Sequence, residues 1–80
     1  MPKYRVRIYT WDDDIETHDV ELPALQAARA FMVKMASDWL AGAPDEFWQD
    51  AEIRVDLRDE RDLVLFNLVI LSVAAPSMLQ

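Results

Sequence analysis

The stretch Val20-Glu21-Leu22-Pro23-Ala24-Leu25-Gln26-Ala27-Ala28-Arg29 contains the change from strand to helix that decides the fold. Before it, apolar and polar residues alternate, which is typical of a half-buried strand. After it, apolar residues recur every three or four positions, which is typical of one helix face. Pro23 is expected to open this helix, because the first helical turn does not need the missing N–H. The apolar face of the predicted helix consists of Leu25, Ala28, Met32, Met35, Ala36, Trp39 and Leu40.

The end of the predicted helix is marked by two residues. Gly42 is the only glycine of the chain and stands where helices commonly end in the left-handed conformation, and Pro44 prevents continuation. Residues 45–49 are expected to form a loop or a single helical turn. Phe47 and Trp48 in this segment are expected to close the end of the core.

Four segments have the pattern of strands. Residues 3–9 and 52–58 alternate between apolar and polar side chains, so each predicts a strand with one buried and one wet face. Residues 16–22 predict a weaker strand, which follows a turn with three consecutive aspartates. Residues 63–71 are apolar almost throughout and predict the fourth strand, after a polar turn at 59–62. The predicted inward positions are Tyr4, Val6, Ile8, Val20, Leu22, Ile53, Val55 and Leu57.

Together these elements predict an α+β fold with the order ββαββ. It consists of a four-stranded, mainly antiparallel sheet with one helix packed on one face. The expected strand order is second–first–third–fourth, so that the first and third strands are central. Residues 1–80 form one small domain with an ordered core over about 3–73 and a C-terminal tail that is loose or at an interface.

The charge of the chain limits its partners. The net charge is -7; residues 11–22 carry six acidic groups, whereas residues 63–80 carry no charged group. An acidic chain repels phosphate backbones, so nucleic acid is disfavoured as a partner. No apolar segment reaches the roughly 20 residues of a membrane-spanning helix, so no membrane association is expected. The chain has no cysteine, which excludes disulfides and thiol chemistry and fits the cytoplasm, the expected location.

The strand-to-helix motif resembles that of a family of small bacterial domains of unknown function. Its members begin with a tyrosine-rich strand and an acidic loop, continue through a helix start of the form Glu-Leu-Pro-x-Leu-x-x-Ala-Arg, and end in a Val-x-Asp-Glu hairpin. Residues 21–29 match the helix start, and residues 53–60 correspond to the hairpin. The resemblance covers most of residues 3–70 and implies the fold without implying an activity.

Two departures from the family pattern concern the last hairpin. The glycine that is usual in the final turn is absent at Arg61-Asp62, and the last strand ends in the apolar Leu68-Val69-Ile70-Leu71 instead of polar residues. A second likeness, of architecture alone, is to antitoxin domains that also begin strand–strand–helix.

No catalytic site is predicted. The single histidine, His18, lies among Glu16, Asp19 and Glu21, a combination that can supply a general base or a metal site. No serine is spaced to form a nucleophile–base pair with it. We therefore interpret His18 as a surface residue of an acidic strand and expect no enzyme activity.

No cofactor or metal site is predicted either. The Asp12-Asp13-Asp14 turn with Glu16 offers the oxygen ligands that Ca²⁺ and Mg²⁺ prefer. A calcium loop, however, needs alternating ligands, a central glycine and a distal glutamate, which this stretch lacks. The three aspartates are interpreted as a solvated turn, although the sequence leaves divalent-cation binding there open.

The outward positions of the first and third strands define a candidate basic face. It consists of Arg5, Arg7, Arg54 and Arg58, with Tyr9 beside them. Arginine next to an aromatic ring can bind phosphate, nucleic acid or an acidic peptide. The competing interpretation is that Asp56 and the acidic residues of the second strand pair with these arginines.

The last strand is apolar on both faces, whereas a single helix can cover only one face. One parity consists of Val64, Phe66, Leu68 and Ile70, and the other of Leu65, Val69 and Leu71. Whichever set faces the helix, the other forms an exposed apolar surface, which typically marks an interface. The candidate interface residues are Val64, Phe66, Leu68, Ile70 and Val73.

We therefore expect a non-catalytic protein-interaction or regulatory module that self-associates through this strand as a homodimer. Two alternatives are that residues 73–79 fold back over the strand, or that a different protein covers it. The rival function is a small antitoxin-type or nucleic-acid-binding regulator that uses the candidate basic face.

Overall fold

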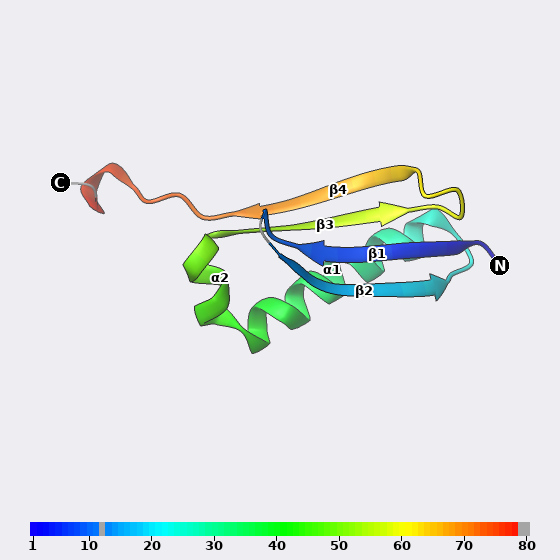
Figure 1. Ribbon diagram of the computed structural model, residues 1–80, viewed down its shortest axis with the longest axis horizontal. Coiled ribbons are helices and arrows are strands. Elements are labelled where there is room, and N and C mark those ends of the chain that lie inside the picture. Colours follow the sequence, from blue (N-terminus) through cyan, green and yellow to red (C-terminus); the bar gives the residue numbers. More distant parts are fainter. Residues whose placement is uncertain (12, 79–80) are drawn as a thin grey trace.

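The computed structural model of the chain describes residues 1–11 and 13–78. An antiparallel sheet carries one long helix across one face, and a shorter helix lies at one end of the sheet (Figure 1). The elements are β1 (Lys3–Tyr9), β2 (Asp14–Glu21), α1 (Leu25–Gly42), α2 (Pro44–Asp50), β3 (Glu52–Arg58), β4 (Val64–Leu71) and a 3₁₀ turn (Pro76–Met78). The strand order β2-β1-β3-β4 and the α+β class are those predicted.

The core lies between the two central strands and α1. In the β1–β3 ladder, Val6 lies opposite Leu57 and Ile8 opposite Val55, and none of the four has exposed surface. Their alternation in sequence is the reason, because every second residue of a strand faces the helix. The helix contributes the buried side chains Ala28, Met32, Met35 and Ala36, which recur with the spacing of one helix face.

The helix boundaries differ from two predictions. Helix α1 begins at Leu25 with Ala24 at its N-cap, so Pro23 precedes the helix instead of opening it. The reason is that the Leu22 N–H still donates to the Pro2 carbonyl (3.1 Å), and the chain needs two residues to leave the sheet. Gly42 is the last helical residue and is not left-handed; Ala43 (φ -141°) makes the bend into α2.

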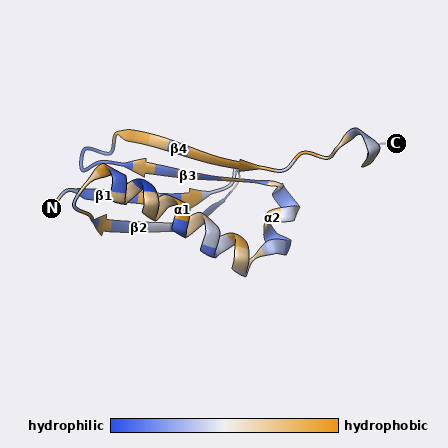
Figure 2. Cartoon of the chain, turned by 180° about the vertical axis from the view of Figure 1, so that it is seen from behind, coloured by the Kyte–Doolittle hydropathy of each residue, from blue (hydrophilic) through white to orange (hydrophobic). Residues whose placement is uncertain are grey.

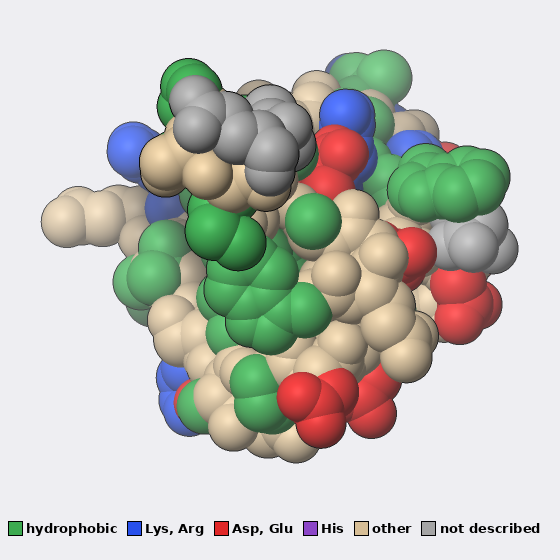
Figure 3. All heavy atoms as spheres, turned by 90° about the vertical axis from the view of Figure 1, so that its left-hand side faces the viewer, with side chains coloured by type: hydrophobic (Ala, Val, Ile, Leu, Met, Phe, Trp, Pro, Cys, Tyr) green, Lys and Arg blue, Asp and Glu red, His purple; other side chains and the backbone are tan. Residues whose placement is uncertain are grey.

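Of the two alternatives predicted for residues 45–49, the loop is wrong and the single helical turn is too short, because Pro44–Asp50 forms helix α2, a second helix where one was expected. Pro44 suits the first helical position, and Asp45 and Glu46 in the first turn stabilise the positive end of the helix dipole. Phe47 is buried as predicted, but Trp48 is 64% exposed and does not close the core. Figure 3 views the molecule from the end that carries α2 and shows apolar side chains at its centre and acidic ones along part of its margin.

Among residues 1–11 and 13–78, two residues other than glycine adopt the left-handed conformation. Ala51 (φ 58°) caps α2, where its N–H donates to the Phe47 carbonyl (2.7 Å), and Asp62 (φ 66°) lies in the turn between β3 and β4. Asp62 therefore stands in the turn where the family pattern has glycine, and the short polar side chain tolerates the conformation.

Replacing Ala51 by glycine is expected to raise the free energy of unfolding by about 0.5–1 kcal/mol, because the β-carbon strain at positive φ exceeds the added flexibility of the unfolded chain. Urea unfolding of the purified variant measures it. Ala51→Val is the control and is expected to be less stable than the wild type, since a branched β-carbon increases the strain. A glycine variant less stable than the wild type would contradict the assignment of strain to this residue.

Candidate interaction surface

The four arginines of the candidate basic face lie together on the sheet face opposite the helices. Because β1 and β3 are neighbours, Arg5 lies opposite Arg58, Arg7 opposite Asp56, and Tyr9 opposite Arg54. Each of the four arginines nevertheless lies beside a carboxylate. The pairs are Arg5–Asp19 (2.8 Å), Arg7–Asp56 (3.3 Å), Arg54–Glu52 (2.7 Å) and Arg58–Asp56 (3.5 Å). The face is therefore a lattice of ion pairs, and it offers little net positive charge to a phosphate backbone.

Asp56 lies at the centre of this lattice and is only 1% exposed. Its Oδ2 atom contacts the guanidinium groups of both Arg7 and Arg58, and its charge is the largest cause of the raised pKa of Arg58. Two buried atoms, Arg7 Nε and Asp56 Oδ1, have no hydrogen-bond partner within the described part of the chain. Arg7 also lies over the Tyr9 ring (4.2 Å to its centroid), which holds its side chain against the sheet. The side chains of Arg7 and Arg58 therefore cover the Asp56 carboxylate and shield it from water.

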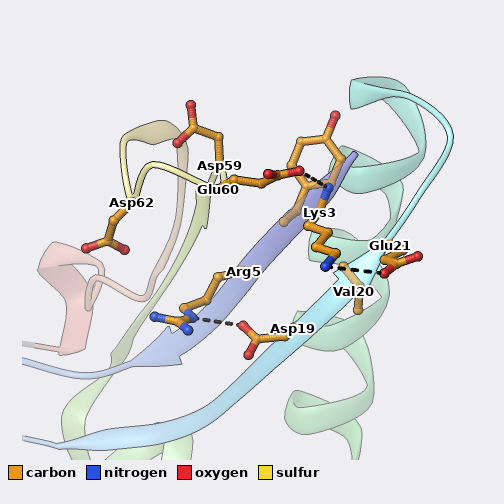
Figure 4. A pocket seen from close by; sticks show the side chains of 9 residues that line it. Lys3, Arg5, Asp19, Val20, Glu21, Asp59, Glu60 and Asp62 are labelled. Carbon is orange, nitrogen blue, oxygen red and sulfur yellow. Dashed lines mark hydrogen bonds and ion pairs between the residues drawn. The ribbon is translucent and has the colours of Figure 1, made fainter. Parts of the chain in front are cut away.

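A shallow pocket of about 540 Å³ lies at the end of the sheet near Lys3 (Figure 4). Part of its charge is paired: Arg5 Nε donates to Asp19, and Lys3 contributes a backbone hydrogen bond to Glu60 (3.3 Å) and an ion pair to Glu21 (3.9 Å). The hydrogen bond from Arg5 lowers the pKa of the Asp19 carboxyl below its usual value. The lining holds two cations and five carboxylates, so the pocket keeps a surplus of negative charge, which disfavours an anionic ligand.

The other polar candidates do not assemble into a reaction centre. His18 faces the helix side, 3.3 Å from Glu16 Oε2 and edge-on to the Phe31 ring at 6.3 Å between centroids. Asp12 of the predicted cation turn lies outside the described residues. Across residues 1–11 and 13–78, no three histidine or carboxylate side chains are placed to hold a metal ion. In the same ranges, no helix is long and apolar enough to cross a membrane.

The two edge strands differ sharply in chemistry. The Leu22 N–H bonds to Pro2 and the Ser72 N–H bonds to Ala51 (2.8 Å), and backbone bonding alternates from these pairs along each antiparallel ladder. The residues whose N–H and C=O groups point away from the sheet are therefore Thr17, Asp19 and Glu21 on β2, and Asn67, Val69 and Leu71 on β4. The β2 edge is protected by acidic side chains, whereas the β4 edge has none.

The side chains of β4 are exposed on both faces. Figure 2 shows that this strand is hydrophobic along most of its length. Leu68 and Ile70 of the candidate interface lie opposite Val55 and Ile53 and pack against the core. The rest of the candidate interface is exposed: Val64 (46%), Phe66 (39%) and Val73 (79%).

The β4 side chains that point away from the helices add to this exposed apolar surface. Val69 (46% exposed) and Leu71 (60%) project beside the ion-pair lattice, opposite Arg54 and Glu52. The interface prediction did not include them, although their parity was recognisable, because only the pairing with β3 decides which set packs on the helix.

An apolar groove lies between β4 and α1 on the helix side, because α1 crosses mainly over β1 and β3 and covers β4 only in part. The groove has a volume of about 590 Å³ and is lined by Leu25, Gln26, Arg29, Ala30, Met32, Val33, Phe66, Asn67 and Leu68. Val33 (56% exposed), Leu25 and Phe66 (each 39%) remain open to solvent there. Arg29 lies over the Phe66 ring at 5.1 Å and is the only charged residue in the lining.

The C-terminal tail leaves this surface open. Residues 72–78 project beyond the end of the sheet instead of folding back over β4 (Figure 1), and Val73 and Met78 are 79% and 77% exposed. Leu79, which belonged to the predicted covering segment, lies outside the described residues. Within the described tail, nothing covers the last strand.

The comparison with known families agrees with the resemblance drawn from the helix-start motif. The model of the family described as Domain of unknown function (DUF6894) matches residues 4–72, which include both longer helices and all four strands except Lys3, the first residue of β1. No curated protein and no solved structure matches the chain.

Proposed function

We propose that this chain, which belongs to the DUF6894 family of domains of unknown function, is a non-catalytic interaction module that self-associates as a homodimer through the β4 edge. The sheet has two faces and two edges. The observation that carries the proposal is that both faces and the β2 edge are protected, whereas the β4 edge is not. One face packs on α1, the opposite face is an ion-pair lattice, and the β2 edge is acidic. The β4 edge combines free backbone groups with apolar side chains.

Charge favours a second copy of the chain as the partner. The protein carries -7 overall, so two copies repel each other wherever their acidic surfaces approach. Residues 63–80 carry no charge, which makes β4 the place where that repulsion is weakest. An antiparallel pair of identical strands about a two-fold axis satisfies the unpaired backbone groups of both. The cysteine-free sequence supports a reducing compartment, and we place the dimer in the cytoplasm.

Sedimentation equilibrium from about 10 μM to about 1 mM protein is expected to give the mass of a dimer at the upper end. Because the interface is apolar and uncharged, the dimer should persist, or tighten, when NaCl is raised from about 0.05 M to about 1 M. A chain that stays monomeric throughout contradicts the proposal, as does a dimer that dissociates at high salt.

A further inference from the structure

Resting on the proposed dimer, we infer that the groove between α1 and β4 is the seat of the C-terminal tail of the second copy. Residues 72–78 have no cover within their own chain and end in apolar side chains, while the groove has apolar side chains and no occupant. The two copies would exchange tails across the two-fold axis, so each dimer contains two identical tail-in-groove contacts.

The direction in which the tail leaves β4 brings it to the groove of the second copy. In an antiparallel pair of β4 strands, the C-terminal end of one strand lies beside the N-terminal end of the other. The groove is lined by Phe66, Asn67 and Leu68, near the N-terminal end of β4, and by residues 25–33 of α1. A tail that leaves the sheet after Leu71 therefore emerges next to the groove of its partner, whereas in its own chain it points away from it (Figure 1).

Area is the second argument. A strand edge of eight residues is about 26 Å long and about 10 Å wide, which offers about 260 Å² to a partner. A stable interface buries about 800 Å² on each partner. The strand edge alone falls well short of that area, and the groove and the tail are the adjoining apolar surfaces that can supply the rest.

Chemistry is the third argument. The tail Val73-Ala74-Ala75-Pro76-Ser77-Met78 carries no charge, and its polar groups are the Ser77 hydroxyl and the main-chain N–H and carbonyl groups. The lining of the groove is apolar apart from Gln26, Arg29 and the backbone of Asn67, and each of these can donate a hydrogen bond to a carbonyl oxygen. An acidic peptide from another protein would meet one arginine that already lies over the Phe66 ring, against a net charge of -7 for the chain.

A spin label tests the placement directly, because the cysteine-free chain accepts one label at one chosen site. Chains labelled at Ser77→Cys are mixed with isotope-labelled wild-type chains, so that any paramagnetic broadening passes between copies. We expect broadening of the amide signals of Leu25, Val33 and Phe66. A label at Asp45→Cys, on the exposed surface of α2, is the matched control and should leave these signals sharp.

Deletion of residues 73–80 gives the second measurement. The Ser72 N–H bond to Ala51 is retained, so the fold should be unchanged, and the dissociation constant should rise about tenfold because one apolar side chain or more per copy loses its burial. A dimer with no broadening in the groove and no change on deletion overturns the tail exchange while leaving the proposed function intact. Absence of any dimer overturns both.

Discussion

Replacing Asp56 by alanine is expected to lower the free energy of unfolding by about 2–3 kcal/mol. The variant leaves Arg7 and Arg58 facing one another across a site from which water is excluded, and removing one partner of a buried ion pair costs about 3–5 kcal/mol. The two arginine side chains are 31% and 26% exposed, so they can turn partly to water, which places the effect at or below the low end of that range. Urea unfolding followed by circular dichroism measures the change.

The matched control for this prediction is Asp19→Ala. Asp19 pairs with Arg5 on the same sheet face, but its side chain is 72% exposed, so its loss should change stability by less than about 1 kcal/mol. If both alanine variants lower the free energy of unfolding by similar, small amounts, the buried carboxylate does not stabilise the ion pairs of the outer face. That result would remove the physical reason for regarding this face as closed to ligands.

Replacing Val69 by lysine is expected to raise the dissociation constant of the dimer at least about 100-fold. Val69 presents its backbone to the free edge of β4 and its side chain to the outer face beside Arg54. Pairing would bring the ammonium groups of the two copies close to each other and to this arginine, and it would remove an apolar contact from each copy. The added charge changes the net charge from -7 to -6, which by itself weakens the repulsion between copies. A loss of association can therefore be attributed to the edge and not to overall charge.

Thr17→Lys is the control for that experiment. Thr17 occupies the equivalent, outward-bonding position on β2, so the same charge is added to the opposite edge of the sheet. Sedimentation equilibrium of both variants should show a monomer for Val69→Lys and the wild-type dimer for Thr17→Lys. If both substitutions weaken the dimer equally, the cause is a general charge effect. If neither changes the dissociation constant, the two copies meet at another surface.

Most of the fold could be predicted from local patterns, because alternation and helical spacing depend on neighbouring residues. Val6 and Ile8 in β1, and Ile53, Val55 and Leu57 in β3, are buried as their alternation predicts, whereas Asp56 is on the predicted outer face but is buried there by its arginine partners. The predictions that failed concern the helix ends, where the path of the chain into the next element determines the backbone conformation. Gly42 is an ordinary helical residue because α2 follows at once, and the left-handed conformation falls instead on Ala51, which no local pattern marks.

The candidate surface could be predicted only in part. The continuous apolar run of the last strand indicated an uncovered side, but not which side, because this depends on the β3–β4 register and on where α1 crosses the sheet. The pairing of Arg7 and Arg58 with one shared carboxylate also depends on that arrangement. The free backbone groups of Val69 and Leu71 follow from the bonding alternation and have no signature in the sequence.

Amide hydrogen exchange along β4, measured at low and at high protein concentration, tests the central claim most directly. Asn67, Val69 and Leu71 direct their N–H groups away from the sheet, whereas Phe66, Leu68 and Ile70 bond to β3. The account predicts that the first three amides exchange rapidly in dilute protein and become protected as the dimer forms, while the other three are protected throughout. A dimer in which the amides of Asn67, Val69 and Leu71 still exchange rapidly would show that the copies meet at another surface.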